Sequence, residues 1–181
     1  LFRLSILSAL ITPIVTVSVA LFLYNLLKPV NKNQAVLMVV FALAALPIAM
    51  LNELNHFAVL QLLNGADYLK VFSVDQLYSQ VMFFLDLSHY GAFIAAIFWG
   101  LWLLPLGYLI LKSNFIPKLI GILMIVAGFG YLVDSVALFL LPDLNIDMSQ
   151  FTFIGEVLLL LWLLIKGVNV EQWEKRALES A

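Results

Sequence analysis

Five long apolar stretches, separated by short polar segments, divide the chain. They run over Leu4–Leu27, Gln34–Leu63, Gln76–Leu111, Ile116–Leu141 and Phe151–Ile165. A helix needs about 20 apolar residues to cross the hydrocarbon core of a bilayer, and the segments between the stretches contain Pro, Gly, Asn and Asp, which end helices. The pattern predicts an all-α fold, a polytopic transmembrane helical bundle with about five spans. We expect residues 1–181 to form a single transmembrane helical domain.

Composition supports this interpretation and excludes several classes of protein. The chain is 64% hydrophobic and 11% charged, whereas an ordinary soluble domain has roughly 25% charged residues. Cysteine is absent, which excludes disulfides and thiolate metal sites. The net charge of −2 and the lack of a basic cluster with interleaved aromatic residues argue against nucleic acid as a partner. The expected partner is the lipid bilayer, and a small-molecule or lipid ligand fits the composition equally well.

Positive charges are distributed unevenly between the two sets of helix ends. Seven flank one set: Lys28, Lys32, Lys112, Lys118, Lys166, Lys175 and Arg176. The other set has two, Arg3 and Lys70. Because such residues gather on the cytoplasmic side, we expect a cytoplasmic C-terminus and Leu1 outside. A chain that starts outside without a signal segment suggests a further helix upstream of Leu1.

Proline and glycine suggest how the helices bend and pack. The stretch Gln76–Leu111 is too long for a perpendicular span, so its outer end projects or the helix bends near Pro105. Four glycines in the third and fourth stretches are expected to allow close helix contact: Gly100, Gly107, Gly121 and Gly128. The segment Asp67–Asp75 and the tail around Trp173 are expected to lie along the two membrane interfaces.

Three segments of the chain resemble a known family. They are FWGLWLLPLGY (98–108), KSNFIPK (112–118) and GFGYLVDS (128–135), and the similarity extends to LFRL at Leu1 and LNELN at Leu51. The chain is similar here to the family named domain of unknown function 4386. The resemblance implies a multi-pass protein of a prokaryotic cytoplasmic membrane, with a further helix upstream. It implies no activity, so function must be argued from individual residues.

Ionisable residues inside apolar helices are the main functional signal. A charged side chain in the centre of a membrane helix costs about 2.5 to 3.5 kcal/mol on insertion scales. Six Asp, Glu and His residues nevertheless lie within the predicted spans: Glu53, His56, Asp86, His89, Asp134 and Glu156. The spacing Glu53–His56 and Asp86–His89 is i, i+3, which puts each pair on one helix face. Asn55 and Ser88 are expected to point away from the carboxylates. All four carboxylates are expected at similar depths near the outer helix ends.

These residues suggest a metal site, but other interpretations explain them too. In four-helix di-iron and di-manganese proteins, two helices each supply a Glu-x-x-His pair and the other two helices each supply one Glu. The predicted helices offer the same set of ligands, except that Asp86 and Asp134 stand where that pattern has Glu. We therefore expect a polar cavity whose ligands would suit Fe, Mn or Zn. The alternatives are a hydrogen-bonded network partly neutralised by Arg3, a transporter or proton relay, and a non-catalytic accessory subunit. Whether the protein is an enzyme stays open. The sequence has no nucleophile-elbow motif, and Ser135 beside Asp134 is no catalytic dyad by spacing alone, so the sequence gives a serine hydrolase little support.

Overall fold

The computed structural model describes residues 1–141 and 147–179, and these ranges contain helices and connecting turns but no strand. The elements are α1 (Phe2–Leu27), α2 (Lys32–Leu63), η1 (Asp67–Val71), α3 (Val74–Ser113), α4 (Lys118–Leu140), α5 (Ser149–Thr152), α6 (Ile154–Ile165) and α7 (Val170–Glu179). Helices α1 to α4 are long and apolar enough to cross a membrane. The segment of α5 and α6 is joined to α7 at a bend of 101°, and this bent pair makes a fifth span if it is counted as one. The predicted helical transmembrane bundle is confirmed.

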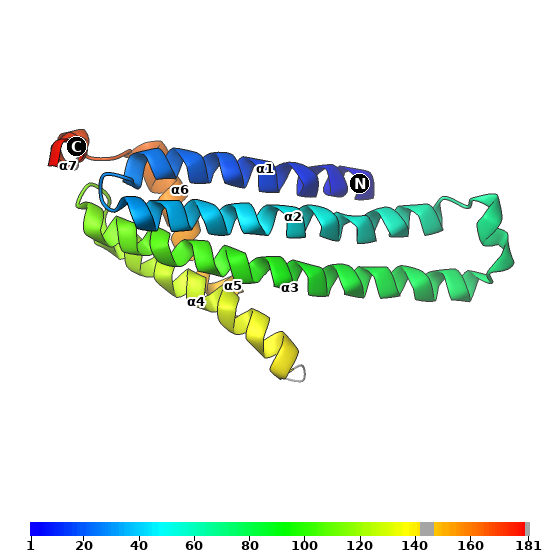
Figure 1. The fold of residues 1–181 in the computed structure, drawn as a ribbon. Coiled ribbons are helices and arrows are strands. Elements are labelled where there is room, and N and C mark those ends of the chain that lie inside the picture. The colour runs from blue at the N-terminus through cyan, green and yellow to red at the C-terminus, as the bar shows by residue number, and fades with distance from the viewer. Residues whose placement is uncertain (142–146, 180–181) are drawn as a thin grey trace.

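The helices pack in the order in which they follow one another along the chain. Helix α1 lies against α2, α2 against α3, α3 against α4, and α4 against α6. Figure 1 shows α1, α2 and α3 side by side, while α4 crosses α3 obliquely and diverges from it toward the end of α4. Helix α3 is therefore central, with α2 along one side and α4 along another.

Local sequence signals explain where the helices begin. The Asn31 side chain caps α2 by accepting a hydrogen bond from the Gln34 N–H at 3.1 Å. Ser73 and Gln76 form a capping box at the start of α3, in which each side chain accepts a hydrogen bond from the other residue's backbone N–H. Asn114 ends α3 in the left-handed conformation, with φ at 62°.

The hydrophobic core lies at one end of the bundle. Its largest fully buried side chains include Leu27, Met38, Leu103, Leu106, Leu109, Ile110 and Met124. This end also holds the α1–α2, α3–α4 and α6–α7 turns (Figure 1) and so carries the seven flanking Lys and Arg residues predicted to share one side. We call it the lysine-rich end.

Two pairs of glycines bring α3 and α4 into backbone contact. A Cβ on Gly100 would lie 2.7 Å from the Gly128 carbonyl oxygen, and a Cβ on Gly121 would lie 2.8 Å from that of Gly107. Real Cβ atoms are not found this close to other atoms, so these positions require glycine. The predicted close contact is confirmed.

The α2–α3 hairpin extends past the other helices at the end opposite the lysines. Helix α3 has 40 residues, about 60 Å at 1.5 Å per residue, against about 30 Å of hydrocarbon. It runs as one helix through Pro105, so of the two predicted alternatives the structure has the projecting end (Figure 1). We call residues 57–87, from α2 through η1 to α3, the α2–α3 arm.

Candidate functional site

The candidate site begins with one turn of α2, near the N-terminal end of α1. Glu53 and His56 are three residues apart, and this spacing brings His56 Nδ1 to 2.9 Å from Glu53 Oε2. The Glu53 residue is 7% exposed, so its carboxylate is held among helices rather than in solvent. Phe2 covers one side of the imidazole, edge to face, with ring centroids 5.8 Å apart.

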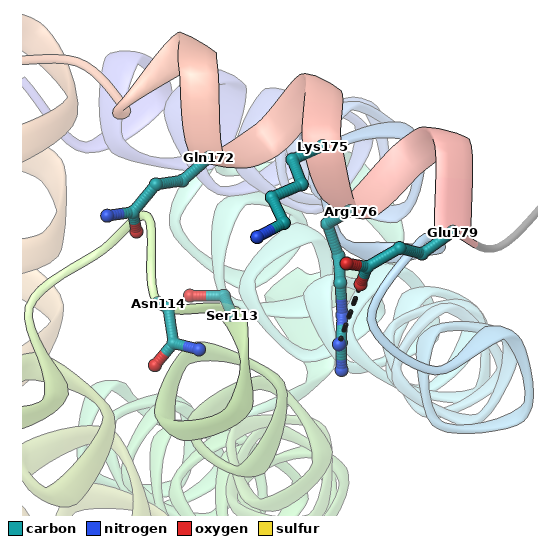
Figure 2. Close-up of a pocket in the computed structure, with 6 residues that line it drawn as sticks. All are labelled: Ser113, Asn114, Gln172, Lys175, Arg176 and Glu179. Carbon is teal, nitrogen blue, oxygen red and sulfur yellow. Dashed lines mark ion pairs between the residues drawn. The ribbon is translucent and has the colours of Figure 1, made fainter.

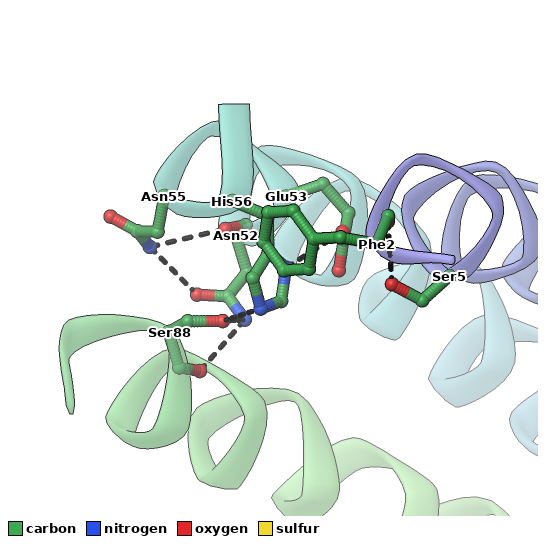
Figure 3. Close-up of polar contacts among 7 residues, drawn as sticks. All are labelled: Phe2, Ser5, Asn52, Glu53, Asn55, His56 and Ser88. Carbon is green, nitrogen blue, oxygen red and sulfur yellow. Dashed lines mark hydrogen bonds and ion pairs between the residues drawn. The ribbon is translucent and has the colours of Figure 1, made fainter. Parts of the chain in front are cut away.

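Helix α3 contributes a hydroxyl to the other side of the imidazole. Ser88 Oγ lies 3.2 Å from His56 Nε2, and Ser88 is 6% exposed. The Asn52 amide donates to the Ser88 carbonyl oxygen at 2.9 Å and approaches Ser88 Oγ at 3.4 Å. Figure 3 shows these side chains meeting between the two helices, with Asn55 to one side of Asn52. We call Asn52, Glu53, Asn55, His56 and Ser88 the polar cluster.

The hydrogen bonds of the polar cluster form a chain with a definite direction. Because an ionised carboxylate only accepts hydrogen bonds, the tautomer of a neutral His56 that fits this contact carries its proton on Nδ1 and donates it to Glu53. Nε2 then has a free lone pair and accepts the Ser88 hydroxyl proton. Upstream, the Asn55 amide donates to Asn52 Oδ1 at 3.0 Å. In this tautomer His56 Nε2 faces the Ser88 hydroxyl as a hydrogen-bond acceptor.

A glycine on α3 makes room for this arrangement. A Cβ on Gly91 would overlap the side-chain amide of Asn52. Gly91 lies three residues after Ser88, on the same side of α3. Close approach of α2 to α3 at this point therefore depends on the absence of a side chain.

The second predicted pair does not join the first. Asp86 and His89 are exposed on α3, and the His89 ring packs against Phe93 with centroids 4.9 Å apart. Helix α2 instead contacts the α3 face that carries the buried residues Val81 and Ser88. Ser88 lies on a different face of α3 from Asp86, as expected, but α2 packs against the Ser88 face. The expectation that the Asp86 and His89 face contributes to the site is therefore wrong.

Asp134 has a structural role at the start of the following helices. It is 3% exposed, and its two carboxylate oxygens accept the backbone N–H groups of Met148 and Ser149, each at 2.7 Å. These N–H groups begin the α5–α6 segment and have no partner within a helix. A carboxylate at this position satisfies both of them and interacts favourably with the positive end of the helix.

Glu156 forms a separate contact between α4 and α6. The Tyr131 hydroxyl donates to Glu156 Oε1 at 3.1 Å. Glu156 lies nine residues from Ile165 at the lysine-rich end of α6, about 14 Å along the helix. Asp134 lies sixteen residues from Lys118 at the lysine-rich end of α4, about 24 Å along that helix. The expectation of one common depth for the four carboxylates is therefore wrong.

The six predicted ligands do not converge in the described structure. Of the six, Glu53 and His56 are in contact, while Asp134 and Glu156 have the partners given above. Within residues 1–141 and 147–179, no group of three or more His, Asp or Glu side chains is placed to hold a metal ion. Arg3 is exposed and forms no ion pair with a carboxylate of these ranges. The geometry gives the predicted metal cavity no support and concentrates the polar contacts at the polar cluster.

Two members of the polar cluster, Asn55 and Ser88, were not predicted to belong to the site, and Ser88 is the one that contacts His56. A signal for it exists, because Asn52 and His56 are four residues apart on one face of α2 and both contact Ser88. Buried polar groups are hydrogen-bonded, so the amide of Asn52 and the imidazole of His56 need a polar partner on the neighbouring helix, and a hydroxyl suits both.

Helices of this length and hydropathy, with polar side chains bonded to one another between them, define a polytopic membrane protein. The chain belongs to the family described as Domain of unknown function (DUF4386), whose match covers residues 1–167. It is 34% identical over 168 residues to an uncharacterized protein of Archaeoglobus fulgidus, a match that covers 93% of this chain and 86% of that protein. No solved structure matches the chain.

Proposed function

We propose that the polar cluster is an acyl-transfer centre that acts on an ester of a lipid-borne substrate at the membrane surface. The observation that carries this proposal is the ordered contact of Ser88 Oγ with His56 Nε2 and of His56 Nδ1 with Glu53. A hydroxyl on one ring nitrogen and a carboxylate on the other is the arrangement that activates serine in hydrolases on unrelated folds.

Each side chain has a defined task in this chemistry. Ser88 Oγ bonds to the ester carbonyl carbon while its proton passes to His56 Nε2. The bond from that carbon to the alcohol oxygen breaks, and the alcohol leaves with the proton. Water then attacks the acyl group, gives a proton to His56, and releases the acid as the proton returns to Oγ. Glu53 holds the imidazole tautomer and stabilises the imidazolium formed in both steps.

Asn52 is suitably located to stabilise the charged intermediate. Its amide nitrogen lies 3.4 Å from Ser88 Oγ, and the oxyanion that forms on attack shares a carbon with that oxygen. An N–H donor fixed beside a developing oxyanion contributes about 2.7 to 4 kcal/mol in a known serine protease. The His56 side chain is 27% exposed, which leaves an approach to the base beside Ser88.

Depth in the membrane favours a lipid ester as the substrate. His56 lies 24 residues after Lys32, and Ser88 lies 25 residues before Ser113, about 36 and 38 Å from the lysine-rich end at 1.5 Å per residue. The hydrocarbon core is about 30 Å thick, and 40 to 45 Å with the headgroups. The polar cluster therefore falls in the headgroup region of the far surface, where the ester bonds of glycerolipids lie.

A fluorophosphonate probe tests the proposal, because it reacts with serines activated by a neighbouring base. The purified protein should be labelled at Ser88, and His56→Ala should slow labelling by about 100-fold or more. Ser79→Ala, on an exposed part of α3, should leave the rate unchanged. Labelling no faster than in Ser88→Ala would show that the polar cluster only holds α2 to α3.

Ser88→Cys provides a second test that does not depend on whether Ser88→Ala folds. The chain has no cysteine, so Ser88→Cys introduces a single thiol beside His56. An imidazole partner favours the reactive thiolate, and alkylation at neutral pH should be faster in this variant than in Ser88→Cys combined with His56→Ala. Equal rates would contradict a base at His56.

Metal binding stays a prediction with its own test. Glu53 and His56 would supply one carboxylate and one imidazole, and the hydroxyl of Ser88 lies beside them. Stoichiometric Fe, Mn or Zn in the purified protein, lost in His56→Ala, would favour a metal site over the serine nucleophile.

We also propose that the protein resides in a prokaryotic cytoplasmic membrane with its lysine-rich end inside, which puts the polar cluster at the outer surface.

A further inference from the structure

Helix α7 is fixed across the lysine-rich end of the bundle by contacts at its start. The Trp173 indole N–H donates to the Leu26 carbonyl oxygen at 2.8 Å, which joins α7 to the end of α1. The Asn169 N–H donates to the Phe115 carbonyl oxygen at 3.2 Å, and the Asn169 side chain caps α7 at Gln172. These contacts hold α7 beside the α3–α4 turn.

A polar hollow lies between α7 and the end of α3. Its volume is about 550 Å³, and it is lined by Ser113, Asn114, Gln172, Lys175, Arg176 and Glu179. Figure 2 shows the Gln172 and Lys175 side chains extending from α7 toward Asn114. All six lining residues are polar or charged, which is unusual for a surface of this apolar chain.

The side chains that line this hollow carry two positive charges, on Lys175 and Arg176, and one negative charge, on Glu179. Arg176 Nη1 is 3.5 Å from Glu179 Oε2, with both side chains partly exposed. Among the ion pairs of the described ranges, Lys175 forms none. An exposed pair at this distance contributes little, so an anion can draw the guanidinium away from Glu179 at low cost. A phosphate would then receive donors from Lys175, Arg176 and the Gln172 amide.

We propose that this hollow binds the phosphate of an anionic phospholipid headgroup. The lipid is the favoured source because the hollow lies at the end of the membrane-spanning helices. Ile165, 73% exposed at the end of α6, and Val170, 58% exposed at the start of α7, offer apolar surface close to α7 along the chain. Anionic headgroups attract any basic residue at the membrane surface by about 1 kcal/mol, so selective retention requires donors that converge on one phosphate, as those of the hollow do. The site is independent of the polar cluster, which lies at the opposite end of the bundle.

Native mass spectrometry of the full chain in micelles that contain equal phosphatidylglycerol and phosphatidylcholine tests this proposal. The protein should retain phosphatidylglycerol selectively, and Lys175→Gln with Arg176→Gln should weaken its retention by about tenfold. The matched control is Lys28→Gln with Lys32→Gln, which removes the same charge from exposed residues at the same end and should change retention by less than about twofold.

Three results would overturn the proposal. Equal losses in the two double variants would indicate unspecific surface charge. Equal retention of both lipids would contradict recognition of an anionic headgroup. Binding of inorganic phosphate at millimolar concentration, without preference for the lipid, would assign the hollow to a soluble anion instead. Circular dichroism of both double variants verifies that α7 and the bundle remain folded.

Discussion

Two buried carboxylates of this protein are stabilised in different ways. Asp134 accepts two backbone N–H groups at 2.7 Å, so both its oxygens are engaged by the main chain of one segment. Glu53 contacts the side chain of His56, which itself can gain and lose a proton. A main-chain N–H keeps its proton and only holds the carboxylate in place, whereas an imidazole can exchange a proton with its neighbours. This difference separates Asp134 from the polar cluster at the level of single residues.

Replacing Asp134 by Asn should therefore affect stability. One oxygen remains to accept an N–H, while the other becomes an NH₂ group that faces a second donor. An orphaned buried N–H costs about 1 to 3 kcal/mol, and we expect a loss of this size in the free energy of unfolding in micelles. Asp67→Asn, which removes only an exposed ion pair with Lys70 in η1, should change it by less than about 1 kcal/mol. Equal effects of the two variants would contradict the capping role.

Gly91 and Asn52 should be coupled energetically. Gly91→Ala puts a methyl group where the Asn52 amide lies, and overpacking of this kind typically costs about 1 to 3 kcal/mol. In an Asn52→Ala background the space is free, so the same change should cost much less. A double-mutant cycle on the free energy of unfolding measures this coupling, and additive effects would show that the two residues do not compete for space.

Only part of the polar cluster could be predicted from the sequence. The Glu53–His56 contact follows from spacing within one helix and from the cost of ionisable groups in a membrane. The partner of His56 depends on which face of α3 meets α2, and spacing within α3 cannot decide that. The face with Val81 and Ser88 is chosen by packing between helices, so Asp86 and His89 remain exposed outside the site.

At the scale of the elements, backbone contact is concentrated where α3 and α4 cross. Each of the two glycine pairs brings a backbone carbonyl oxygen to less than 3 Å from the place where a Cβ would lie. In a bilayer, helix association depends on such close packing because lipid chains are as apolar as the helices. The crossing near the core should therefore be sensitive to small changes in volume.

Gly128→Ala should loosen this crossing. Its Cβ would meet the Gly100 carbonyl oxygen at 2.8 Å, so the two backbones must separate, at a cost of about 1 to 3 kcal/mol. Val126→Leu adds a methylene group one half-turn away on an exposed face and should be close to neutral. Thermal unfolding followed by circular dichroism measures both, and a neutral Gly128→Ala would contradict close packing at this point.

Helix boundaries were predictable to within about two residues for α1 to α4 because apolar runs and turn residues mark them directly. The oblique path of α4 and the position of α7 were not predictable, since they depend on glycine contacts and on the Trp173 hydrogen bond between segments far apart in the chain.

For the whole molecule, the asymmetry of charge predicts how the bundle sits in the membrane. The absence of native cysteine permits single-cysteine labelling in cells. A cysteine at Ser73, in the turn before α3, should react with an impermeant maleimide from outside. A cysteine at Asn114, at the lysine-rich end, should react only after permeabilisation. The reverse pattern would invert the orientation and put the polar cluster in the inner leaflet.

The α2–α3 arm has a consequence for the integrity of the chain. Helices α2 and α3 are linked covalently through η1 at the far tip, where Lys70 is exposed, yet they contact each other more extensively than any other helix pair of the described ranges. Trypsin added from outside should cut after Lys70 and leave the two pieces, one ending at Lys70 and one beginning at Val71, bound as one complex. The same two pieces, expressed as separate genes, should reassemble into a complex in which the polar cluster forms again, because its residues come from both pieces and meet through packing.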